Sequence, residues 1–234
     1  MSISKRLKLV ASMVTKGNIV ADVGTDHGYV PIYLLKENIC PRAYAMDINK
    51  GPIERAKEHV EQEGLTNQIE LIHCDGMKGL AGKNVDTVII AGMGGELVCR
   101  ILDESPVIGE IKELVLSPHS EVAKVRSNII NKGFRIVDEA MIEDYGKFYT
   151  VIKAHKNMDG DTIEEYSEFD LVYSRLLFEK KDETFGRYLN VMKDKYTGII
   201  QLMKDNKQEL SERYFELGKN LEECWIAINK YNEM

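Results

Sequence analysis

The run from Asp22 to Pro31, DVGTDHGYVP, constrains the fold of this chain more than any other stretch. It overlaps a short apolar segment, Ile19 to Val23, and Gly24 and Gly28 let the backbone turn sharply and approach a ligand where a Cβ would collide. A buried strand, a glycine loop and a helix start in this order are typical of nucleotide-binding α/β domains. An ordinary strand-to-helix loop is the alternative.

An acidic residue inside this loop narrows the class of ligand. The spacing Gly-x-Asp-x-Gly departs from G-x-G-x-x-G at the second glycine, and Asp26 places a negative charge where a pyrophosphate would lie. The loop therefore disfavours a phosphate-bearing cofactor. A ligand with ribose hydroxyls and a positive charge, such as S-adenosylmethionine with its sulfonium and ammonium groups, suits it better.

The length and charge of the chain limit its organisation. With 234 residues and 44% hydrophobic content, the chain can form one sizeable α/β domain and an appendage. The net charge is −7, and the 17 acidic and 11 basic residues from Asp159 onward account for −6 of it. A nucleic-acid partner would therefore need a local basic patch in the nearly neutral first part.

The spacing of the cysteines indicates whether the chain binds a metal, and its apolar segments indicate its cellular location. Cys40, Cys74, Cys99 and Cys224 form no C-x-x-C pair and no metal-like spacing with the five histidines, so we expect reduced thiols and no metal. The N-terminal segment lacks the apolar core of a signal peptide, and we find no apolar span near twenty residues. We expect a cytoplasmic protein without a membrane partner.

Two further predicted strands end in acidic residues. The strand from Arg42 to Met46 is followed by Asp47 and Ile48, and an acid at this place can accept hydrogen bonds from both ribose hydroxyls. A helix cap or a turn residue is the alternative for Asp47, because a helix follows from Lys50 to Glu63. After a third strand, Ile69 to Ile72, the pair Asp75-Gly76 could accept an adenine amino group while the glycine leaves room for the ring.

A glycine cluster follows the fourth predicted strand. Val85 to Ile90 is a continuous apolar run, as in a central parallel strand buried on both faces. Gly92, Met93, Gly94 and Gly95 then precede a helix that runs through Leu102. The glycines open space at the carboxyl end of the strand, where open α/β sheets bind ligands. A loop tightened for helix packing would explain one of these glycines, but less easily three.

The remaining elements of the first part complete the predicted sheet. A fifth strand ends in Ser117, Pro118 and His119, and two longer strands flank DYGK, Asp144 to Lys147, as in a β-hairpin. The remaining predicted ranges are helix 4–15, helix 29–36, strand 114–116, helix 122–131 and strands 134–142 and 148–154. This order predicts a mixed seven-stranded Rossmann-like sheet with helices on both faces and right-handed crossovers.

The C-terminal part has a different pattern, and we place the domain boundary between residues 156 and 157, at the linker Asn157 to Gly160. Apolar residues then recur at helical spacing up to a break near Glu183 to Gly186, and we expect Asp205 to Lys207 to bend the following helix. The first series is Ile163, Tyr166, Phe169, Tyr173 and Leu176, and the heptad series is Leu189, Tyr196, Met203, Leu210, Leu217, Cys224 and Tyr231. We expect two antiparallel helices of a coiled coil within a monomer, with a homodimeric coil as the alternative.

The motifs together resemble a known family. Residues 2 to about 155 are similar to class I S-adenosylmethionine-dependent methyltransferases, and the whole chain resembles the bacterial tRNA (adenine-22-N1) methyltransferase family. The resemblance rests on SKRL, ADVGTDHGYVP, the Asp75-Gly76 pair, IAGMGGEL at 90–97, LSPH at 116–119 and DYGKFY at 144–149. One departure is that Ser117 and His119 stand where the family's LQPN pattern has Gln and Asn.

The resemblance implies a set of site residues. For S-adenosylmethionine it implies Asp22, Gly24, Thr25, Asp26, Gly28, Asp47, Ile48, Asp75, Gly76, Gly92, Met93 and Gly94. For the reaction it implies Asp26, His27 and Tyr29, and for the substrate Lys5, Arg6, Pro118, His119, Phe148 and Tyr149. The candidate contacts to tRNA phosphates are Lys5, Arg6, Lys8, Lys78, Lys124 and Arg126, although solvated lysines are the alternative for the first helix.

The expected reaction is methylation of adenine N1 at position 22 of tRNA. The neutral base already presents a lone pair at N1, so the enzyme mainly has to align it, and the base must leave its stack to enter the pocket. The loop after the fourth strand lacks an Asn/Asp-Pro-Pro-aromatic run, which agrees with a ring nitrogen as target. Another RNA, a small molecule or a protein is the alternative acceptor, and an NAD-dependent oxidoreductase or a non-catalytic scaffold are further alternatives.

Overall fold

The computed structural model describes residues 3–158, 160 and 165–233. The chain divides into two compact units, Met1–Val172 and Tyr173–Met234, and this division lies 16 residues beyond the boundary expected after residue 156. Of the predicted linker, Asp159 lies outside the described residues, as does Ile163 of the first helical series.

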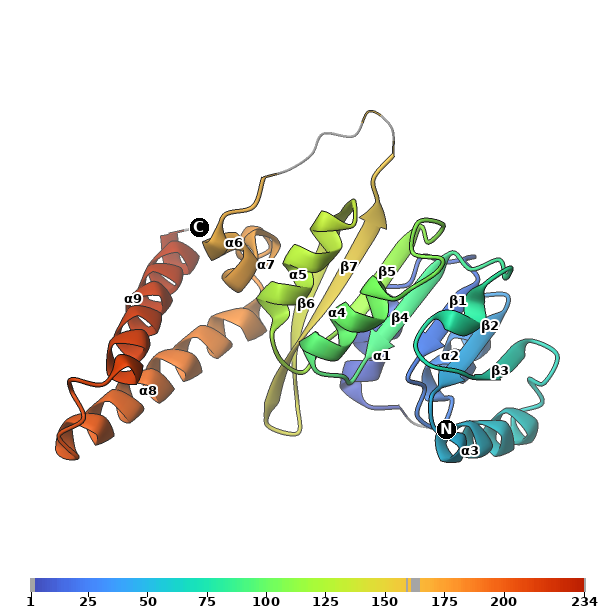
Figure 1. The fold of residues 1–234 in the computed structure, drawn as a ribbon, viewed down its shortest axis with the longest axis horizontal. Helices are drawn as coiled ribbons and strands as arrows, with labels where there is room; N and C mark the ends of the chain where they lie inside the picture. The colour runs from blue at the N-terminus through green and yellow to red at the C-terminus, as the bar shows by residue number, and fades with distance from the viewer. Residues whose placement is uncertain (1–2, 159, 161–164, 234) are drawn as a thin grey trace. The chain divides into compact units, whose positions relative to one another are not determined.

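The first unit is built on a seven-stranded sheet with the order β3-β2-β1-β4-β5-β7-β6 (Figure 1). The strands are β1 (Val20–Val23), β2 (Ala43–Asp47), β3 (Ile69–His73), β4 (Thr87–Ala91), β5 (Glu113–Ser117), β6 (Phe134–Asp144) and β7 (Lys147–Lys156). β1 to β5 pair in parallel, whereas β7 runs antiparallel to β5 and to β6. The predicted mixed sheet is thus confirmed.

Helices cover both faces of the sheet. The helices are α1 (Lys5–Ser12), α2 (Tyr29–Lys36), α3 (Lys50–Gln62), the 3₁₀ turn η1 (Lys78–Leu80), α4 (Gly95–Asp103), α5 (Val122–Asn131) and α6 (Glu168–Tyr173). Buried side chains of α1, α2 and α3 form one core with strand residues such as Val20, Ile89 and Val115. α4 and α5 lie side by side on the other face (Figure 1). The apolar runs form strands because both of their faces are buried in this way.

The strand order reverses between β1 and β4, which are hydrogen-bonded neighbours. Chain connections leave β1 and β4 toward opposite sides at such a point, so a crevice forms outside the carboxyl ends of the two strands. The loops that carry Gly24 and Gly92 begin at this edge, and the sequence prediction placed its cofactor loops there. We call it the carboxyl edge of the sheet.

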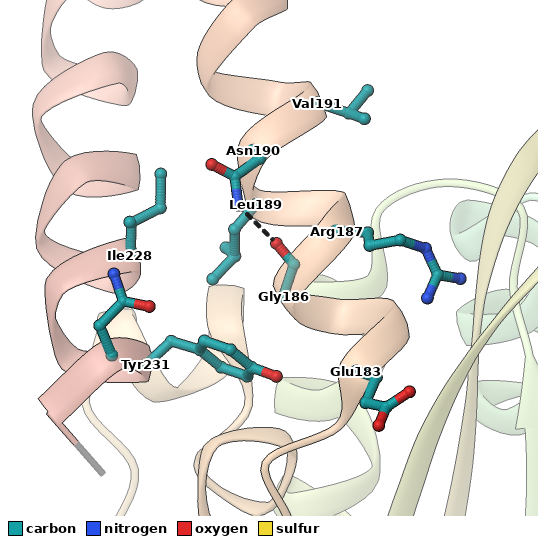
Figure 2. A pocket seen from close by; sticks show the side chains of 9 residues that line it. Glu183, Gly186, Arg187, Leu189, Asn190, Val191, Ile228 and Tyr231 are labelled. Atoms are coloured by element: carbon teal, nitrogen blue, oxygen red, sulfur yellow. Dashed lines mark hydrogen bonds between the residues drawn. The ribbon is translucent and has the colours of Figure 1, made fainter.

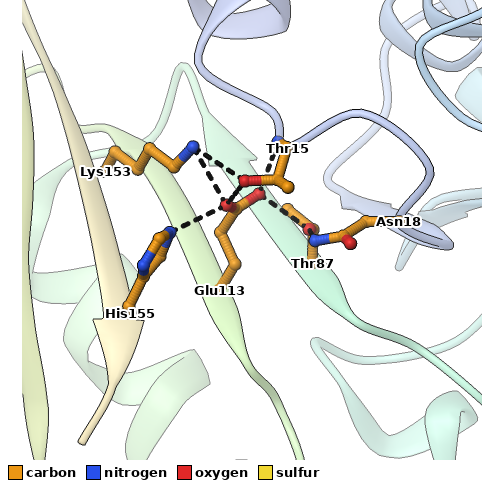
Figure 3. Close-up of polar contacts among 6 residues, drawn as sticks. All are labelled: Thr15, Asn18, Thr87, Glu113, Lys153 and His155. Carbon is orange, nitrogen blue, oxygen red and sulfur yellow. Dashed lines mark hydrogen bonds and ion pairs between the residues drawn. The ribbon is translucent and has the colours of Figure 1, made fainter.

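A buried carboxylate organises the opposite, amino edge. Glu113 is 2% exposed and accepts hydrogen bonds from the backbone N–H and hydroxyl of Thr15, from the Thr87 hydroxyl at 2.8 Å and from Lys153 Nζ at 3.1 Å (Figure 3). His155 Nε2 lies 3.1 Å from the same carboxylate. These contacts tie the loop after α1 to β4, β5 and β7, so they fix the position of α1 on the sheet.

The second unit consists of α7 (Arg175–Glu179), α8 (Glu183–Asp205) and α9 (Glu212–Glu233). α8 and α9 pack as an antiparallel hairpin, because Cys224 Sγ lies 3.3 Å from the Leu189 carbonyl oxygen and Lys181 Nζ bonds the Tyr231 carbonyl. In Figure 2 the Tyr231 ring faces Gly186, where an added Cβ would lie 2.7 Å from the ring. The prediction paired the first helical series with one long helix that carries the heptad series. The structure instead pairs the two halves of the heptad series, α8 and α9, as a helical hairpin.

Two details of the C-terminal prediction were wrong. The helix break expected near Glu183 to Gly186 lies before Glu183, since Gly186 is inside α8 and Asp182 caps its first turn. Residues 206–211 end α8 and reverse the chain instead of bending one helix, and Leu210 is 93% exposed in this turn. Among the described residues, no helix is both long enough and apolar enough to cross a bilayer.

Candidate active site

A buried acid opens the carboxyl edge. Asp22 is 5% exposed at the end of β1, and burial raises the pKa of its carboxyl to about 6. The nearby Thr25 hydroxyl offsets part of this effect, although it does not reach hydrogen-bond geometry, and the charge of Asp47 adds to it. Because burial disfavours the ionised carboxyl, a cation bound beside Asp22 would stabilise the carboxylate.

Gly24 and Met93 bring the loops after β1 and β4 together. Gly24 has φ +78°, and a Cβ on it would stand 1.9 Å from the Met93 Cε atom. The backbone at Gly24 is therefore covered by the end of a flexible thioether side chain, which can move aside for a ligand. Gly24 N–H and Thr25 N–H both donate to the Met46 carbonyl at 2.8 Å, so β2 fixes this turn.

The acids after β2 and β3 already have partners. Asp47 Oδ1 accepts a hydrogen bond from the Asn49 N–H at 2.7 Å, which agrees with the alternative of a turn residue. The Cys74 N–H donates to the Asp47 carbonyl oxygen. Asp75 Oδ2 accepts Lys78 Nζ at 2.6 Å, and this bond lowers the pKa of the Asp75 carboxyl. A carboxylate has several acceptor positions, so both acids keep acceptor capacity. Ile48 is 57% exposed beside them.

The predicted catalytic residues form a stacked ring cluster with a histidine from α3. His27 and Tyr29 are nearly parallel, with ring centroids 5.1 Å apart, and His59 lies 5.5 Å from each ring. The Asp26 carboxylate is 70% exposed, and its Oδ1 lies 3.3 Å from His27 Nε2 and 3.4 Å from Arg55 Nη2. The loop therefore presents a carboxylate beside an aromatic surface.

A second cluster contains most of the predicted substrate residues. The Arg6 guanidinium lies 5.2 Å from the centroid of the Tyr149 ring, and the His119 ring centroid lies 5.4 Å from that of Tyr149. A Cβ on Gly92 would lie 3.6 Å from Arg6 Nη2 and 3.8 Å from His119 Nε2. The backbone N–H of His119 donates to the Met93 carbonyl oxygen at 2.8 Å. Because the Met93 side chain covers Gly24, this bond links the cluster to the Gly24 loop.

Charge and burial also set the state of His119. Partial burial, together with the positive charges of Arg6 and Lys147, lowers the pKa of the imidazole below its ordinary value. The lowered pKa favours the neutral imidazole, which can accept a hydrogen bond through one ring nitrogen and donate through the other.

Unpartnered buried polar atoms gather at the same edge. Six buried side-chain N or O atoms of the described residues lack a hydrogen-bond partner, and four of them belong to Arg6, Thr25, His27 and Ser117. Ser117 ends β5, and the other three residues lie in or beside the two clusters. Buried polar atoms are normally satisfied by protein, water or ligand, so this concentration fits a polar ligand at the carboxyl edge.

Several predicted residues have other roles. Arg126 is 2% exposed and bonds Glu139 at 2.8 Å, as well as the Leu171 and Val172 carbonyls, so its prediction as a phosphate contact was wrong. Lys78 pairs with Asp75 and Glu104, and Lys124 pairs with Glu96. Gly95 serves packing, since a Cβ on it would lie 2.6 Å from the Ser120 carbonyl oxygen.

The remaining predicted residues lie around the two clusters. Lys5 and Lys8 are exposed on α1, and Pro118 is buried between Ser117 and His119. Phe148 is half-buried next to Tyr149 on β7, and Gly28 and Gly76 have positive φ at the loops after β1 and β3. Gly94 caps α4, where an added Cβ would make ordinary contact with the Ser120 hydroxyl.

Two cavities lie away from this edge. One, of about 460 Å³, is the groove beside Tyr231 in the helical hairpin (Figure 2), and the other, of about 360 Å³, borders Glu113 at the amino edge. The polar groups around Glu113 satisfy one another, and the hairpin groove is lined mainly by apolar atoms. The carboxyl edge is the better candidate because the unpartnered atoms and the buried acid lie there. No group of three or more metal-ligating side chains occurs within the described ranges.

Arg55 and His59 were not predicted as site residues. Both contact the loop of Asp26 and His27 from α3, and their spacing of four residues places them on one helix face. That spacing was the available signal, but polar residues four apart are equally common on a solvated face.

The fold and the carboxyl-edge loops define a methyltransferase of the Rossmann-like α/β class, and the family model described as "Methyltransferase domain" matches residues 3–152. The chain is 31% identical to the Bacillus subtilis tRNA (adenine(22)-N(1))-methyltransferase over 91% of its own length and 92% of that protein. It belongs to the tRNA (adenine(22)-N(1))-methyltransferase family.

Solved structures agree over nearly the whole chain. The M. capricolum TrmK structure in complex with S-adenosyl-homocysteine has a TM-score of 0.87 at 26% identity, covering 99% of this chain and all of that one (100%). A Streptococcus pneumoniae protein in complex with S-adenosyl-L-methionine has a TM-score of 0.83 at 29% identity, covering 97% of this chain and 100% of that one.

Proposed function

We propose that this protein transfers a methyl group from S-adenosylmethionine to N1 of adenine 22 in tRNA. The observation that carries the proposal is the match to the Bacillus subtilis enzyme over 91% of the chain, and the unpartnered buried polar atoms with the buried Asp22 support a polar ligand at the switch point of the sheet. Family membership and the relatives solved with S-adenosylmethionine and its product support the choice of cofactor.

The residues at the ends of β1 to β4 would hold the cofactor. When bound, S-adenosylmethionine supplies a methyl group on a positively charged sulfur. Asp22 lies where a cation is favoured, Asp47 offers its carboxylate to ribose hydroxyls, and Asp75 offers an acceptor for the adenine amino group. The proposed cofactor set is Asp22, Gly24, Thr25, Asp26, Gly28, Asp47, Ile48, Asp75, Gly76, Gly92, Met93 and Gly94.

The two clusters would hold the target base. N1 of a neutral adenine needs no general base, so the residues mainly orient the ring and exclude water. The exposed Asp26 carboxylate can accept from the N6 amino group and stabilise the positive charge of the methylated ring, while Tyr29 and Tyr149 offer aromatic faces. Arg6 and His119, with Lys5, Pro118 and Phe148 beside them, would contact the rest of the nucleotide.

The decisive test is the product. Purified protein, S-adenosylmethionine and unmodified tRNA are incubated, and the tRNA is digested and analysed by mass spectrometry. We expect N1-methyladenosine at position 22, and none in a matched tRNA in which another base replaces that adenine. Methylation of a protein or small-molecule acceptor instead of tRNA would favour the alternative acceptor class. Loss of cofactor binding in Asp22→Ala, measured by calorimetry, would support the cofactor site independently of the acceptor.

We further propose that the protein acts as a monomer in the cytoplasm, where tRNA is available. The helical hairpin buries Leu189, Cys224 and Ile228 within one chain, so it does not need a second copy to cover these side chains. Light scattering after size exclusion would show a mass near 26.6 kDa. A stable mass of twice this value would instead support the homodimer.

A further inference from the structure

Helix α3 presents one face to the glycine loop after β1. Arg55, Ala56 and His59 share this face, because residues three and four apart lie on the same side of an α-helix. Arg55 reaches the loop's carboxylate, the Ala56 Cβ would lie 3.3 Å from a Cβ on Gly28, and His59 Nδ1 is 2.9 Å from the His27 carbonyl oxygen. α3 therefore contacts the loop at successive residues.

The loop has a backbone conformation that needs support. His27 has φ 61° and Gly28 has φ 69°, so two successive residues are left-handed. Glycine adopts this region freely, but a residue with a Cβ is disfavoured there and keeps the conformation only where its surroundings hold it. The bond from α3 to the His27 carbonyl is such a restraint, since it acts on the strained peptide itself.

The chemistry of the bond fixes the donor. A carbonyl oxygen only accepts, so His59 Nδ1 carries the proton and donates, and it can do so in the neutral ring with that tautomer or in the imidazolium. The His59 ring also stacks on His27 and Tyr29, with interplanar angles of 24° and 18°. His59 thus contacts both proposed catalytic rings.

We propose that His59 is a positioning residue for the methyl transfer. Its Nδ1–H bond to the His27 carbonyl holds the left-handed loop and thereby sets the direction of Asp26 and of Tyr29, the first residue of α2. The inference rests on the proposed function. Its physical basis is that small displacements of groups that align a reacting base cost large factors in rate.

Three substitutions separate the hydrogen bond from the ring. His59→Asn keeps an amide N–H near the position of Nδ1, His59→Phe keeps a ring without a donor, and His59→Ala removes both. We expect kcat to fall about 10- to 100-fold in His59→Ala and His59→Phe, and to stay within about threefold of wild type in His59→Asn. The Kd for S-adenosylmethionine, measured by calorimetry, should rise by a smaller factor than kcat falls in His59→Ala and His59→Phe, because the same loop also carries Asp26 and Gly28 of the proposed cofactor set.

A neighbour on the same helix provides the matched control. Glu58 is exposed on α3, and Glu58→Ala should keep the wild-type kcat. A second readout does not depend on activity: amide hydrogen exchange of peptides covering residues 25–30 should be faster in His59→Ala and His59→Phe, and close to wild type in His59→Asn. A loss of folding in His59→Ala leaves the Asn and Phe variants to decide.

The outcomes distinguish the inference from the function. Wild-type kcat and exchange in His59→Phe would overturn the inference, because the ring alone would then suffice. A fall in kcat for His59→Asn equal to that for His59→Phe would overturn it as well. If the wild-type protein fails to methylate tRNA, the proposed function fails, and the exchange rates still show whether His59 holds the loop.

Discussion

At Asp22 the fold buries a carboxyl group that a positively charged ligand would require in its ionised form. Asp22 is buried at the end of β1, and burial raises the pKa of its carboxyl to about 6. In the unfolded chain the carboxyl titrates near its ordinary value of about 4. Between these two values the folded chain holds a proton that the unfolded chain has lost. The stability from this group is therefore complete below pH ~4 and is lost as the pH rises through ~6.

This linkage predicts a pH-dependent effect of Asp22→Asn. Without cofactor, the free energy of unfolding of the variant should rise relative to wild type, by up to about 3 kcal/mol, between pH ~4 and pH ~7. Urea denaturation of both proteins across this range measures the difference. Parallel pH profiles for the two proteins would contradict the raised pKa, since all other titrating groups are shared.

Arg126 shows how a basic residue can be misassigned from sequence. Its guanidinium is buried against Glu139 and two backbone carbonyls, so it stabilises the fold rather than meeting a phosphate. Arg126→Met should lower the free energy of unfolding by about 3–5 kcal/mol, because the Glu139 carboxylate loses its buried cation. The double variant Arg126→Met/Glu139→Leu should recover much of this loss. Urea denaturation checks both, and a single variant as stable as wild type would contradict the buried pair.

Residues at strand ends were the predictable part of the site. Asp22 lies near the end of an apolar run, Asp47 and Asp75 follow two others, and parallel strands place such residues at one edge. Arg126 was misread because an amphipathic helix pattern does not show which polar residues at the border of the apolar face are buried. His59 was missed because its contact depends on how α3 packs against a loop 32 residues away in the sequence.

At the scale of the loops, the glycines divide into two kinds. Gly24 has positive φ and lies beneath a movable methionine, whereas Gly95 lies against backbone atoms of the loop before α5. The sequence predicted ligand space for the cluster at 92–95, with helix packing as an alternative that would explain one of its glycines. The structure identifies Gly95 as the packing glycine, because a Cβ there would meet the Ser120 carbonyl oxygen at 2.6 Å.

This division predicts separate effects of alanine substitutions. Gly24→Ala should cost about 1–2 kcal/mol of stability from its left-handed backbone and should also weaken binding of S-adenosylmethionine, because the Cβ enters the ligand space. Gly64→Ala is the control, since Gly64 has φ +70° with nothing within 4 Å, and it should cost similar stability without loss of binding. Gly95→Ala should destabilise by about 1–3 kcal/mol through overpacking.

Urea denaturation and calorimetric titration with S-adenosylmethionine measure the two effects separately. Equal cofactor affinity in the Gly24→Ala and Gly64→Ala variants would remove Gly24 from the cofactor site. A Gly95→Ala variant as stable as wild type would remove the packing role.

The sequence predicted the ends of an element where its apolar periodicity stops. It missed an end where the periodicity continues across it. β4 begins at Thr87, two residues after the predicted start, while α5 spans the predicted Val122 to Asn131. In the hairpin, the heptad series continues through the turn at residues 206–211, so the pattern concealed the end of α8. Leu210 belongs to the series and yet is 93% exposed, because periodicity does not report the backbone reversal.

At the scale of the whole molecule, a protein with a negative net charge must bind tRNA, which is also negatively charged. The net charge is −7, so attraction to tRNA cannot come from the average charge. Of the basic residues proposed to meet phosphates, Lys78 and Lys124 pair with acids and Arg126 is buried. Lys5 and Lys8 are exposed on α1, the helix that also carries Arg6, and these residues are the remaining candidates.

This distribution predicts which lysines determine the salt dependence of tRNA binding. Each phosphate contact releases counterions, so the slope of log K against log salt concentration measures the number of contacts. Lys5→Ala/Lys8→Ala should make the slope shallower by about 1.4 to 1.8 for two lost contacts. The matched double variant Lys78→Ala/Lys124→Ala should leave the slope within about 0.5 of wild type, because these lysines already neutralise protein acids. Filter binding at 50 to 200 mM salt gives all three slopes, and a larger change in the control pair would move the tRNA path away from α1 toward η1 and α5.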